Sequence, residues 1–522
     1  MGSFQSVTIN RFLGMNTNRD ELSLLPGQLS LNENYLYMTN GGLEERGGGA
    51  KLTNAPSVGN KLYSLANYTN QNGQEFLITN QGTDAYYYNS GWNSLSLTLT
   101  SNQKMRWAQS GKGSSIALYG VNGSNLVTKV SGITPTGSSV ANSPTTCKYI
   151  EFHKNRLFAA DDNTLFFTEV LGFDTWNTAS NTIDIAPGKD GVITGLEVWG
   201  DALFIFKQYG VYILPNADSP VPKLNWVILR TDALTGSLSP DSIRRTKAGI
   251  FYLSTDNFIR LLSPNISYSS GEYTLGGSGS PIVSEDIQND LDLLIEKKDI
   301  SNAQAIVFND LYILSFQSVN NSTSNYNDLT YFADVAKFIQ QPQIQQPQPF
   351  WGTFTGFNYD YFTTQKDNDR IKLYAVKGPN GETHETMNET IKNDNGGAIK
   401  SKAILGWYPI GDEATYSKVN RIYFVGETEN WSINLIFNAY EYGNVIPSQG
   451  LGTFYQTSQF SASTVGTAIV GTDLVGSLTV GSYKFRANLR GNKFRAEMSN
   501  SNANEFTRIL KIIFYFRPVR SH

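Results

Sequence analysis

The sequence contains few of the residues that build metal and redox centres. Its 522 residues include one cysteine, Cys147, and three histidines, His153, His384 and His522. A single cysteine excludes an internal disulfide, a cysteine-based zinc site and an iron–sulfur cluster, so we expect Cys147 to be a small buried hydrophobe in or near a strand. We expect His153 just before a strand and His384 in a polar loop, as surface or packing residues, because no second histidine follows at zinc-protease spacing.

Charge and long apolar runs are scarce as well. Charged residues make up 16% of the chain, the formal net charge is −4, and no basic stripe is present, which argues against tight, sequence-specific DNA binding. No stretch approaches the roughly 18 apolar residues of a membrane-spanning helix, and the first residues lack the charged and apolar regions of a secretory signal. We therefore expect a soluble protein that is made and kept in a reducing compartment.

Motifs for catalysis or nucleotide binding are also missing. No Gly-x-Ser-x-Gly elbow follows a strand, and no phosphate-binding loop ends in Gly-Lys-Ser/Thr. The run Gly47-Gly48-Gly49 indicates a turn, since no helical pattern follows it. A glycosidase needs two facing carboxylates, but the sequence alone selects no pair among its 45 acidic residues. We predict no enzyme, and no catalytic, cofactor-binding or metal-binding residues.

What the sequence has in abundance is strand-forming and turn-forming residues. It contains 47 glycines, 28 tyrosines and 29 phenylalanines, and asparagine, serine and threonine are plentiful. Aromatic and β-branched side chains suit the half-buried faces of sheets, while glycine and asparagine suit the turns between strands. The composition predicts an all-β protein.

A two-strand unit recurs through the middle of the chain. Its first strand is read at residues 75–79, 115–119, 155–160, 203–206, 249–253, 311–316 and 371–376, and the second strand of the first five units at 85–88, 125–128, 164–168, 210–214 and 258–262. With Phe76, Ile116, Leu157, Leu203 and Ile250 as equivalent points, the steps are 40, 41, 46 and 47 residues. That period is typical of one four-stranded propeller blade. The next two steps, 61 and 62 residues, require insertions.

We predict a β-propeller core with additional β-rich N- and C-terminal segments, the latter a platform- or sandwich-like appendage. Residues 1–60 form an extended and hairpin segment, residues 61–380 the propeller, and residues 381–522 an appendage whose final strand completes a sheet. The insertions are polar stretches at 318–327 and 340–349; the second, rich in glutamine and proline, is a surface loop or a ligand for a partner domain. A β-sandwich, or several small β domains, would also give short strands at regular spacing.

The pattern changes from about Lys400 onward. Residues 419–425 and 431–437 predict longer, paired strands, and residues 493–498 and 507–516 are strongly β again. Between them, residues 466–481 are rich in glycine, threonine, valine and serine and predict a loop or a loosely held hairpin, because little pins their register.

Both ends of the chain and one repeat resemble a single family of virion proteins. The N-terminal motifs are a Gly14-Met15-Asn16 turn within residues 12–20, Leu25-Pro26-Gly27-Gln28, Asn32-Glu33-Asn34, and the hairpin Gly41-Gly42-Leu43-Glu44-Glu45-Arg46-Gly47-Gly48. The unit from Asn155 to Trp176 resembles the most recognisable blade of the family, and the stretch from Gly491 to Pro518 resembles its closing strands. The family is the tail nozzle of short-tailed bacteriophages, also called tail tubular protein B or stabilisation protein.

The resemblance implies a homohexameric ring below the portal and adaptor, through which double-stranded DNA leaves the capsid without sequence-specific binding. It implies assembly in the host cytoplasm, residence in the virion tail, no stable membrane insertion, and contacts with adaptor or head–tail connector proteins and with tail fibres or spikes. As a hypothesis, loops bearing Asp161, Asp162, Asp256 and Asn257 face the lumen or a neighbouring copy; alternatively they are solvated turns.

Two other functions fit the same sequence. A receptor-binding or fibre-docking tail protein would use exposed aromatic residues such as Trp92, Trp176 and Trp351 to contact glycan or protein. A propeller glycan hydrolase would carry its carboxylates on the same fold, since a fold does not determine a function.

Overall fold

The computed structural model describes residues 5–111, 115–217, 223–269, 272–277, 279–295, 300–321, 326–339, 348–409, 416–427, 431–441, 444–446, 453–456 and 480–519. Within these residues the predicted all-β class is confirmed, because the only α-helices there are α1 (Gln288–Leu294) and α2 (Val335–Ile339). No helix in the described ranges is long and apolar enough to span a membrane. His522 and most of the predicted loops at 340–349 and 466–481 lie outside the described residues, as do residues 322–325 of the stretch 318–327.

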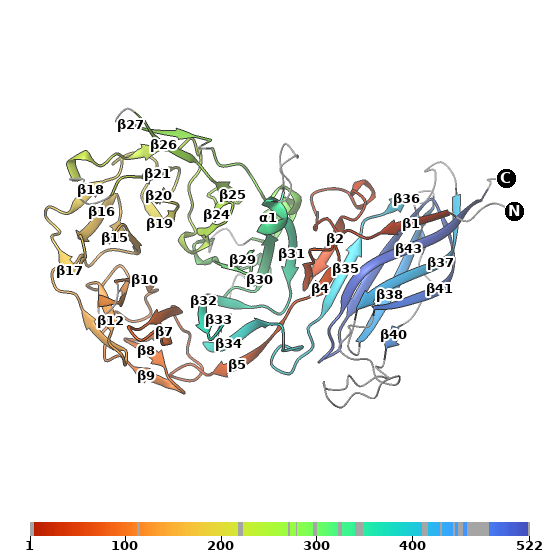
Figure 1. The fold of residues 1–522 in the computed structure, drawn as a ribbon, viewed down its shortest axis with the longest axis horizontal. Coiled ribbons are helices and arrows are strands. Elements are labelled where there is room, and N and C mark those ends of the chain that lie inside the picture. Colours follow the sequence, from red (N-terminus) through yellow and green to blue (C-terminus); the bar gives the residue numbers. More distant parts are fainter. Residues whose placement is uncertain are drawn as a thin grey trace.

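Most of the chain between residues 48 and 388 folds into seven small sheets arranged in a ring (Figure 1). Sheet 1 contains β6 (Ala66–Thr69), β7 (Glu75–Gln81), β8 (Asp84–Tyr88) and β9 (Trp92–Ser94); sheet 2 contains β10 (Arg106–Ser110), β11 (Ala117–Val121), β12 (Thr128–Ser131) and β13 (Thr136–Ser139); sheet 3 contains β14 (Tyr149–His153), β15 (Arg156–Asp161), β16 (Thr164–Glu169), β17 (Gly172–Trp176) and β18 (Thr182–Asp184). Sheet 4 contains β19 (Ile193–Trp199), β20 (Ala202–Lys207), β21 (Val211–Leu214) and β22 (Leu229–Arg230).

The last three sheets return the chain to its starting point. Sheet 5 contains β23 (Arg244–Thr246), β24 (Gly249–Leu253) and β25 (Ile259–Leu262); sheet 6 contains β28 (Gln304–Phe308), β29 (Leu311–Phe316), β30 (Leu329–Asp334) and β31 (Phe350–Phe354); sheet 7 contains β32 (Tyr359–Asp367), β33 (Arg370–Lys377), β34 (Glu382–Asn388) and β5 (Gly48–Thr53). Sheet 6 is one end of a larger sheet that extends out of the ring.

The two-strand unit read from the sequence corresponds to the second and third strands of these sheets. Its first strands are β7, β11, β15, β20, β24, β29 and β33. In sheet 2 the third strand begins at Thr128 and not at Asn125, because the turn is longer than expected. The side-chain oxygen of Asn122 accepts hydrogen bonds from the backbone N–H groups of Ser124 and Asn125 and holds those residues in the turn.

Neighbouring sheets pack face to face, and successive side chains of one strand enter opposite gaps. In β20, Leu203 belongs to the apolar cluster shared with sheet 3, and Phe204 to the cluster shared with sheet 5. In β24, Tyr252 packs toward sheet 4 and Phe251 toward sheet 6. This is the period-two alternation of a strand that is buried on both faces, and it explains why these strands are apolar throughout.

The ring closes through its first strands and through the two ends of the chain. The first strands of sheets 2 to 7 contact one another in order, and β32 of sheet 7 contacts β6 of sheet 1. The outermost strand of sheet 7 is β5, in which Ala50 lies opposite Glu385 of β34. Because β5 precedes residue 60 and β34 follows residue 380, the domain boundaries predicted at these two positions both cross sheet 7.

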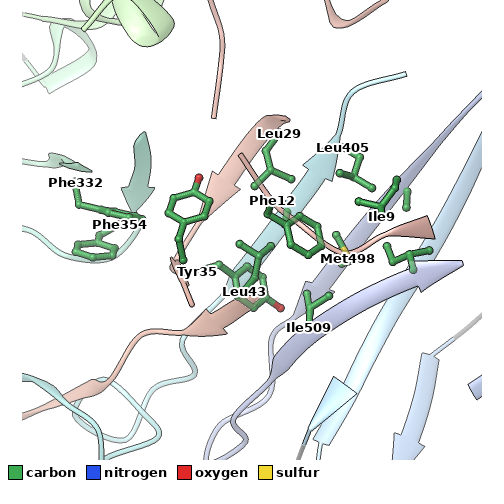
Figure 2. Packing of buried hydrophobic residues seen from close by; sticks show 14 of the residues in the cluster. Ile9, Phe12, Leu29, Tyr35, Leu43, Phe332, Phe354, Leu405, Met498 and Ile509 are labelled. Atoms are coloured by element: carbon green, nitrogen blue, oxygen red, sulfur yellow. The ribbon is translucent and has the colours of Figure 1, made fainter. Parts of the chain in front are cut away.

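The remaining strands form a two-layer sandwich beside the ring (Figure 1). One layer contains β1 (Gln5–Ile9), β3 (Tyr35–Tyr37), β4 (Leu43–Glu45), β43 (Arg508–Val519), β37 (Tyr416–Glu427) and β41 (Val480–Gly491). The other contains β2 (Leu29–Glu33), β35 (Ser401–Leu405), β36 (Tyr408–Pro409), β42 (Lys493–Asn500), β38 (Trp431–Glu441), β39 (Asn444–Ile446) and β40 (Thr453–Gln456). Figure 2 shows the core between them, where Leu43 and Ile509 of the first layer face Leu405 and Met498 of the second.

The structure corrects two details of the predicted appendage. The strands read at 419–425 and 431–437 are β37 and β38, which lie in different layers and do not pair with each other. The final strand, β43, lies inside its sheet: it pairs with β37 on one side and with the N-terminal strands β1 and β4 on the other. The first and last strands of the chain are therefore direct neighbours.

Ring and sandwich share one continuous sheet. Strand β2 pairs with β35 of the sandwich and, in parallel, with β31 of sheet 6, where Glu33 lies opposite Thr353. An eleven-stranded sheet therefore runs from β28 in the ring to β39 in the sandwich. We call the region around β2, β4 and β31, where the two parts meet, the junction.

Candidate functional site

The four residues proposed to face the lumen or a neighbouring copy lie in two equivalent turns. Asp161 ends β15 and Asp162 follows it in the turn to β16, while Asp256 and Asn257 connect β24 to β25, so both turns follow the second strand of a sheet. Asp162 and Asn257 have φ of +49° and +65°, a conformation that Asp and Asn tolerate better than most residues. Asp256 pairs with Arg260 of its own sheet at 2.6 Å. None of the four lines the central cavity described below, and their facing stays a prediction.

The aromatic residues expected to be exposed are mostly buried. Trp351 has no exposed surface and donates from its indole Nε1 to the carbonyl oxygen of Val283 at 2.8 Å, and Trp176 is also buried. Trp92 is half-buried and donates to the carbonyl oxygen of Asn54. The prediction of exposure is therefore wrong for Trp176 and Trp351, because they lie in β17 and β31 and pack in apolar clusters of the ring.

The cysteine and histidine predictions have mixed outcomes. Cys147 is buried beside sheets 2 and 3, as predicted, and burial raises the pKa of its thiol. His153 ends β14 and is a buried packing residue, with its ring 6.3 Å from that of Phe158. His384 is not in a polar loop; it is buried in β34, where Nε2 lies 3.4 Å from Oε2 of Glu382. Strand pairing to β5 buries it, and no local sequence signal indicates that contact.

At the junction, Arg46 has no exposed side-chain surface. Its Nη2 lies 2.5 Å from Oδ2 of Asp394 and its Nη1 donates to Oδ1 at 3.0 Å, while Nε donates to Oδ1 of Asn34 at 2.9 Å. The guanidinium carbon lies 5.7 and 5.3 Å from the ring centroids of Phe354 and Phe357. A bidentate ion pair stacked on two rings holds the end of β4, the loop after β34 and the exit of β31 together.

Asn34 positions the Arg46 side chain and joins the same three segments. Its backbone has φ of +62°, a left-handed conformation for which asparagine is favoured. Its side-chain nitrogen donates to Oγ1 of Thr355 at 2.6 Å and to the carbonyl oxygen of Lys400 at 2.7 Å. Its side-chain oxygen also accepts from the backbone N–H of Thr355 at 3.1 Å. Both polar atoms of the Asn34 side chain are therefore hydrogen-bonded.

The preceding turns are shaped by close approaches of the backbone. Gly27 has φ of +88°, and a Cβ there would lie 2.2 Å from the carbonyl oxygen of Arg11, so only glycine fits. Asn16 donates from its side chain to Oδ1 of Asp286 at 2.6 Å, and its own Oδ1 accepts from the backbone of Asn18 and Arg19. The turn thereby ties the N-terminal segment to the region after sheet 5.

Glu45, next to Arg46, is a buried carboxylate within the sandwich. It is 2% exposed and accepts hydrogen bonds from Oγ of Ser401 at 2.5 Å and from the backbone N–H of Thr507 at 3.3 Å. Burial raises the pKa of Glu45 to about 7, although both hydrogen bonds and the charge of Arg46 oppose the rise. Asn34, Glu45 and Arg46, all from the N-terminal motifs, are therefore held by buried polar contacts at the junction.

A second candidate site is a cavity of about 810 Å³ at the centre of the ring. Residues from the first strand of each of the seven sheets, β6, β10, β14, β19, β23, β28 and β32, line it. Its charged side chains are Lys104, Arg106, Arg244, Arg245, Glu151, Glu197 and Asp241. The cavity thus carries charges of both signs and is lined by the first strand of every sheet of the ring.

An ion cluster crosses this chamber. Asp241 lies in a 3-10 turn (Pro240–Ser242) that leads into sheet 5, and it pairs with Arg106 of sheet 2 at 2.9 Å and with Lys104 at 2.7 Å. Burial would raise the pKa of Asp241, but Arg106 and Lys104 outweigh it and hold the pKa well below its usual range. Burial lowers the pKa of Lys104 to about 8. The cluster ties together two sheets that are three positions apart in the ring.

Two carboxylates lie on the neighbouring strands β14 and β19. Burial raises the pKa of Glu151 to about 8, and the negative charge of Glu197 adds to the rise. Burial also raises the pKa of Glu197, while Arg244 and Arg245 lower the pKa of both groups. A carboxyl group held protonated near neutral pH beside a second carboxylate is an arrangement that can transfer protons. In the described part of the chain, no three His, Cys, Asp or Glu side chains gather in a way that could hold a metal ion.

Comparison with known proteins adds little. No protein-family model matches the chain, and no curated protein sequence does. Among solved structures, the computationally designed Ika8 protein is 10% identical with a TM-score of 0.36, and Saccharomyces cerevisiae Sqt1 is 9% identical with a TM-score of 0.37. Each alignment covers 65% of this chain and 99% of the other. At this level of similarity, neither neighbour assigns a fold family or a function.

Proposed function

We propose that this chain is a seven-bladed β-propeller with a β-sandwich, and that it serves as a structural tail protein of a phage, the nozzle. In this role identical copies form a homohexameric ring below the portal and adaptor, and double-stranded DNA passes through the ring without sequence-specific binding. In the virion tail, this hexameric ring contacts connector proteins on one side and fibres or spikes on the other. The chain itself performs no catalysis.

The junction is the observation that carries this proposal. Three residues of the N-terminal motifs that resemble the nozzle family make long-range contacts at the junction and in the turn that precedes it: Arg46 with Asp394, Asn34 with Thr355, and Asn16 with Asp286. Together with the eleven-stranded sheet, these contacts make the two parts one continuous body. A wall segment that must keep its shape under the pressure of packed DNA needs such a body, whereas a two-domain enzyme that opens and closes does not.

The cross-braced centre fits the same role. The Arg106–Asp241–Lys104 cluster holds opposite sheets of the propeller together, which favours a stiff block over an open funnel. The balance of charge over the chain, −4 in total, also suits a conduit along which phosphates slide, because a strongly basic wall would bind them.

Negative-stain imaging of the purified protein, combined with mass measurement, tests the proposal. We expect six-fold rings with a central hole, at low and at high salt, and we expect the protein in purified virions. A protein that stays monomeric under all these conditions and is absent from assembled particles would overturn the nozzle assignment.

One observation favours a second candidate, a glycan hydrolase. Glu151 and Glu197 in the central cavity combine a raised pKa with a neighbouring carboxylate, which resembles the acid and the second carboxylate of a glycosidase. A monomer that degrades host polysaccharide, with activity lost in Glu151→Gln, would favour this function. If the protein has no activity on host surface polysaccharide and forms hexameric rings, the results favour the nozzle.

A further inference from the structure

A two-stranded hairpin projects from the ring next to sheets 4 and 5 (Figure 1). It consists of β26 (Asn265–Ser269) and β27 (Glu272–Gly276), with Ile266 opposite Leu275 and Tyr268 opposite Tyr273. Alternate residues of a strand share a face, so these two pairs lie on one side of the hairpin. Ile266 and Leu275 pack against the apolar cluster between sheets 4 and 5. The hairpin is thus anchored at its base.

Beyond its base the same apolar face is uncovered. The rings of Tyr268 and Tyr273 lie 4.7 Å apart, and Tyr268 is 63% exposed. The opposite face is polar, with the hydroxyls of Ser267 and Thr274 only 2.7 Å apart. Among the described residues of the hairpin, Glu272 alone carries a charge. Tyr273 is half-buried. Beyond its base the hairpin therefore presents an aromatic pair, of which Tyr268 is exposed, and one acidic group, and aromatic residues of this kind are typical anchors of protein interfaces.

The junction carries a groove of matching character. Its volume is about 610 Å³, and its walls include the apolar side chains of Leu13, Leu25 and Phe350 and the cationic side chains of Arg11, Arg19 and Lys337. Leu25 is 51% exposed and Arg11 and Arg19 are exposed. The acid in the groove is Asp286, and burial raises its pKa to about 6, although Arg19 opposes the rise. The groove therefore has an apolar surface and an excess of positive charge.

We propose that the β26–β27 hairpin of one copy docks in the junction groove of a second copy. The inference deepens the nozzle function and rests on it. An aromatic, acidic tip complements an apolar, cationic groove. Within one copy the base of the hairpin is held on sheets 4 and 5, whereas the groove lies by β31, the outer strand of sheet 6, next to the sandwich (Figure 1). Because the anchored base keeps the hairpin away from the groove of its own copy, the contact forms between copies. Because it joins two different surfaces, it propagates from copy to copy, and it gives a closed ring when the rotation between neighbouring copies closes after six steps.

The first test compares assembly of three proteins by mass photometry over a range of concentrations. We expect Tyr268→Ser/Tyr273→Ser to raise the concentration needed for assembly at least about tenfold, since aromatic anchors dominate interface energies. The matched control, Ser267→Ala/Thr274→Ala, alters the other face of the same hairpin and should assemble like the wild type. An unchanged melting temperature of each protein shows that the fold is intact.

The second test places the two surfaces directly. The only native cysteine, Cys147, is buried, so copies carrying Tyr268→Cys and copies carrying Leu25→Cys can be mixed and oxidised. We expect a cross-linked pair in that mixture and much less with Ser267→Cys in place of Tyr268→Cys. In addition, Glu272→Arg and Arg11→Glu should each weaken assembly, and their combination should restore part of it.

The outcomes separate the two proposals. If the wild type forms no oligomer, both the ring and the hairpin contact are wrong. If the wild type assembles and the tyrosine variant assembles equally well, or if the cross-link is no stronger than that of the control, the hairpin is not the contact between copies. The proposed hexameric ring is then unaffected.

Discussion

Replacement of Arg46 tests whether the junction is held by its buried ion pair. In Arg46→Met the apolar part of the side chain is kept, and the guanidinium that serves both oxygens of Asp394 is lost. Removal of one partner of a buried ion pair costs about 3–5 kcal/mol, because the other charge is left uncompensated. Asp394 is 29% exposed on its side chain, so water recovers part of that cost, and Asn34 keeps a donor in the backbone of Thr355. We therefore expect a loss of about 3 kcal/mol.

Differential scanning calorimetry and urea unfolding measure this loss. The entropy of unfolding of a chain of this length is about 1.1 kcal/mol/K, so the melting temperature should fall by about 3 °C when ring and sandwich unfold together. Arg46→Lys should have an intermediate effect, because an ammonium group keeps the charge but not the bidentate geometry.

An exposed ion pair provides the control. Lys247 pairs with Asp310 at 2.8 Å, and the two side chains are 69% and 38% exposed. Lys247→Met removes a cation as Arg46→Met does, yet an exposed pair contributes less than about 1 kcal/mol. If Arg46→Met destabilises the protein no more than Lys247→Met, the ion pair does not hold the junction.

Three further changes test buried charges elsewhere. Lys207 is fully buried, and its ammonium donates to the carbonyl oxygens of Ile185, Ala186 and Lys189 at 2.9, 3.0 and 2.6 Å. Lys207→Met leaves these three acceptors unsatisfied and should lower the free energy of unfolding, measured by urea titration, by about 2–4 kcal/mol. A change within about 0.5 kcal/mol would contradict this expectation. Asp241→Asn leaves Arg106 and Lys104 uncompensated and should cost about 3–5 kcal/mol, measured in the same way, with the exposed Asp201→Asn as a near-neutral control. The pKa of Glu45 is raised from 4.5 to about 7, so the folded state binds the Glu45 proton more tightly than the unfolded state does, and the free energy of unfolding falls as pH rises from about 4.5 to about 7. The free energy of unfolding of Glu45→Gln should therefore increase by up to about 3 kcal/mol relative to that of the wild type between pH 4.5 and pH 8. A difference between the two proteins that does not change with pH would show that Glu45 titrates normally.

The sequence predicted the second strand of each sheet of the ring, and the third strand of the first five, because each of these strands gives a local signal. Residues 203–206 and 249–253 are short apolar runs bounded by turn residues, and such runs indicate strands that are buried on both faces. Their spacing of 40 to 47 residues follows from one sheet per repeat. Within this part of the chain, the largest error in position was the start of β12, which moved because the side chain of Asn122 extends a turn.

The contacts that close the structure carry no comparable local signal. His384 was placed in a polar loop because its neighbours are polar, yet pairing of β34 with β5, some 330 residues away, buries it. Asp241 follows Pro240 and has no local feature that marks it, and only the ring brings Arg106 to it from 135 residues away. Arg46 lay in a recognisable motif, but its partner Asp394 could not be identified, since nothing near residue 394 distinguishes it from other acidic turn residues. Long-range partners of this kind require the fold.

The two ends of the chain carry most of this long-range closure. Strand β5 completes sheet 7, β1 pairs with the final strand β43, and β2 bridges sheet 6 to the sandwich. The ring therefore needs β34, which ends at Asn388, and the sandwich needs β43, which ends at Val519. Contacts of such high sequence separation form slowly. A chain that lacks β43 leaves β1 and β37 without this strand between them, and open edges pair readily with other chains. The N-terminal motifs thus secure the closed form at the junction, where Arg46, Asn34 and Asn16 each bind a residue more than 250 positions away.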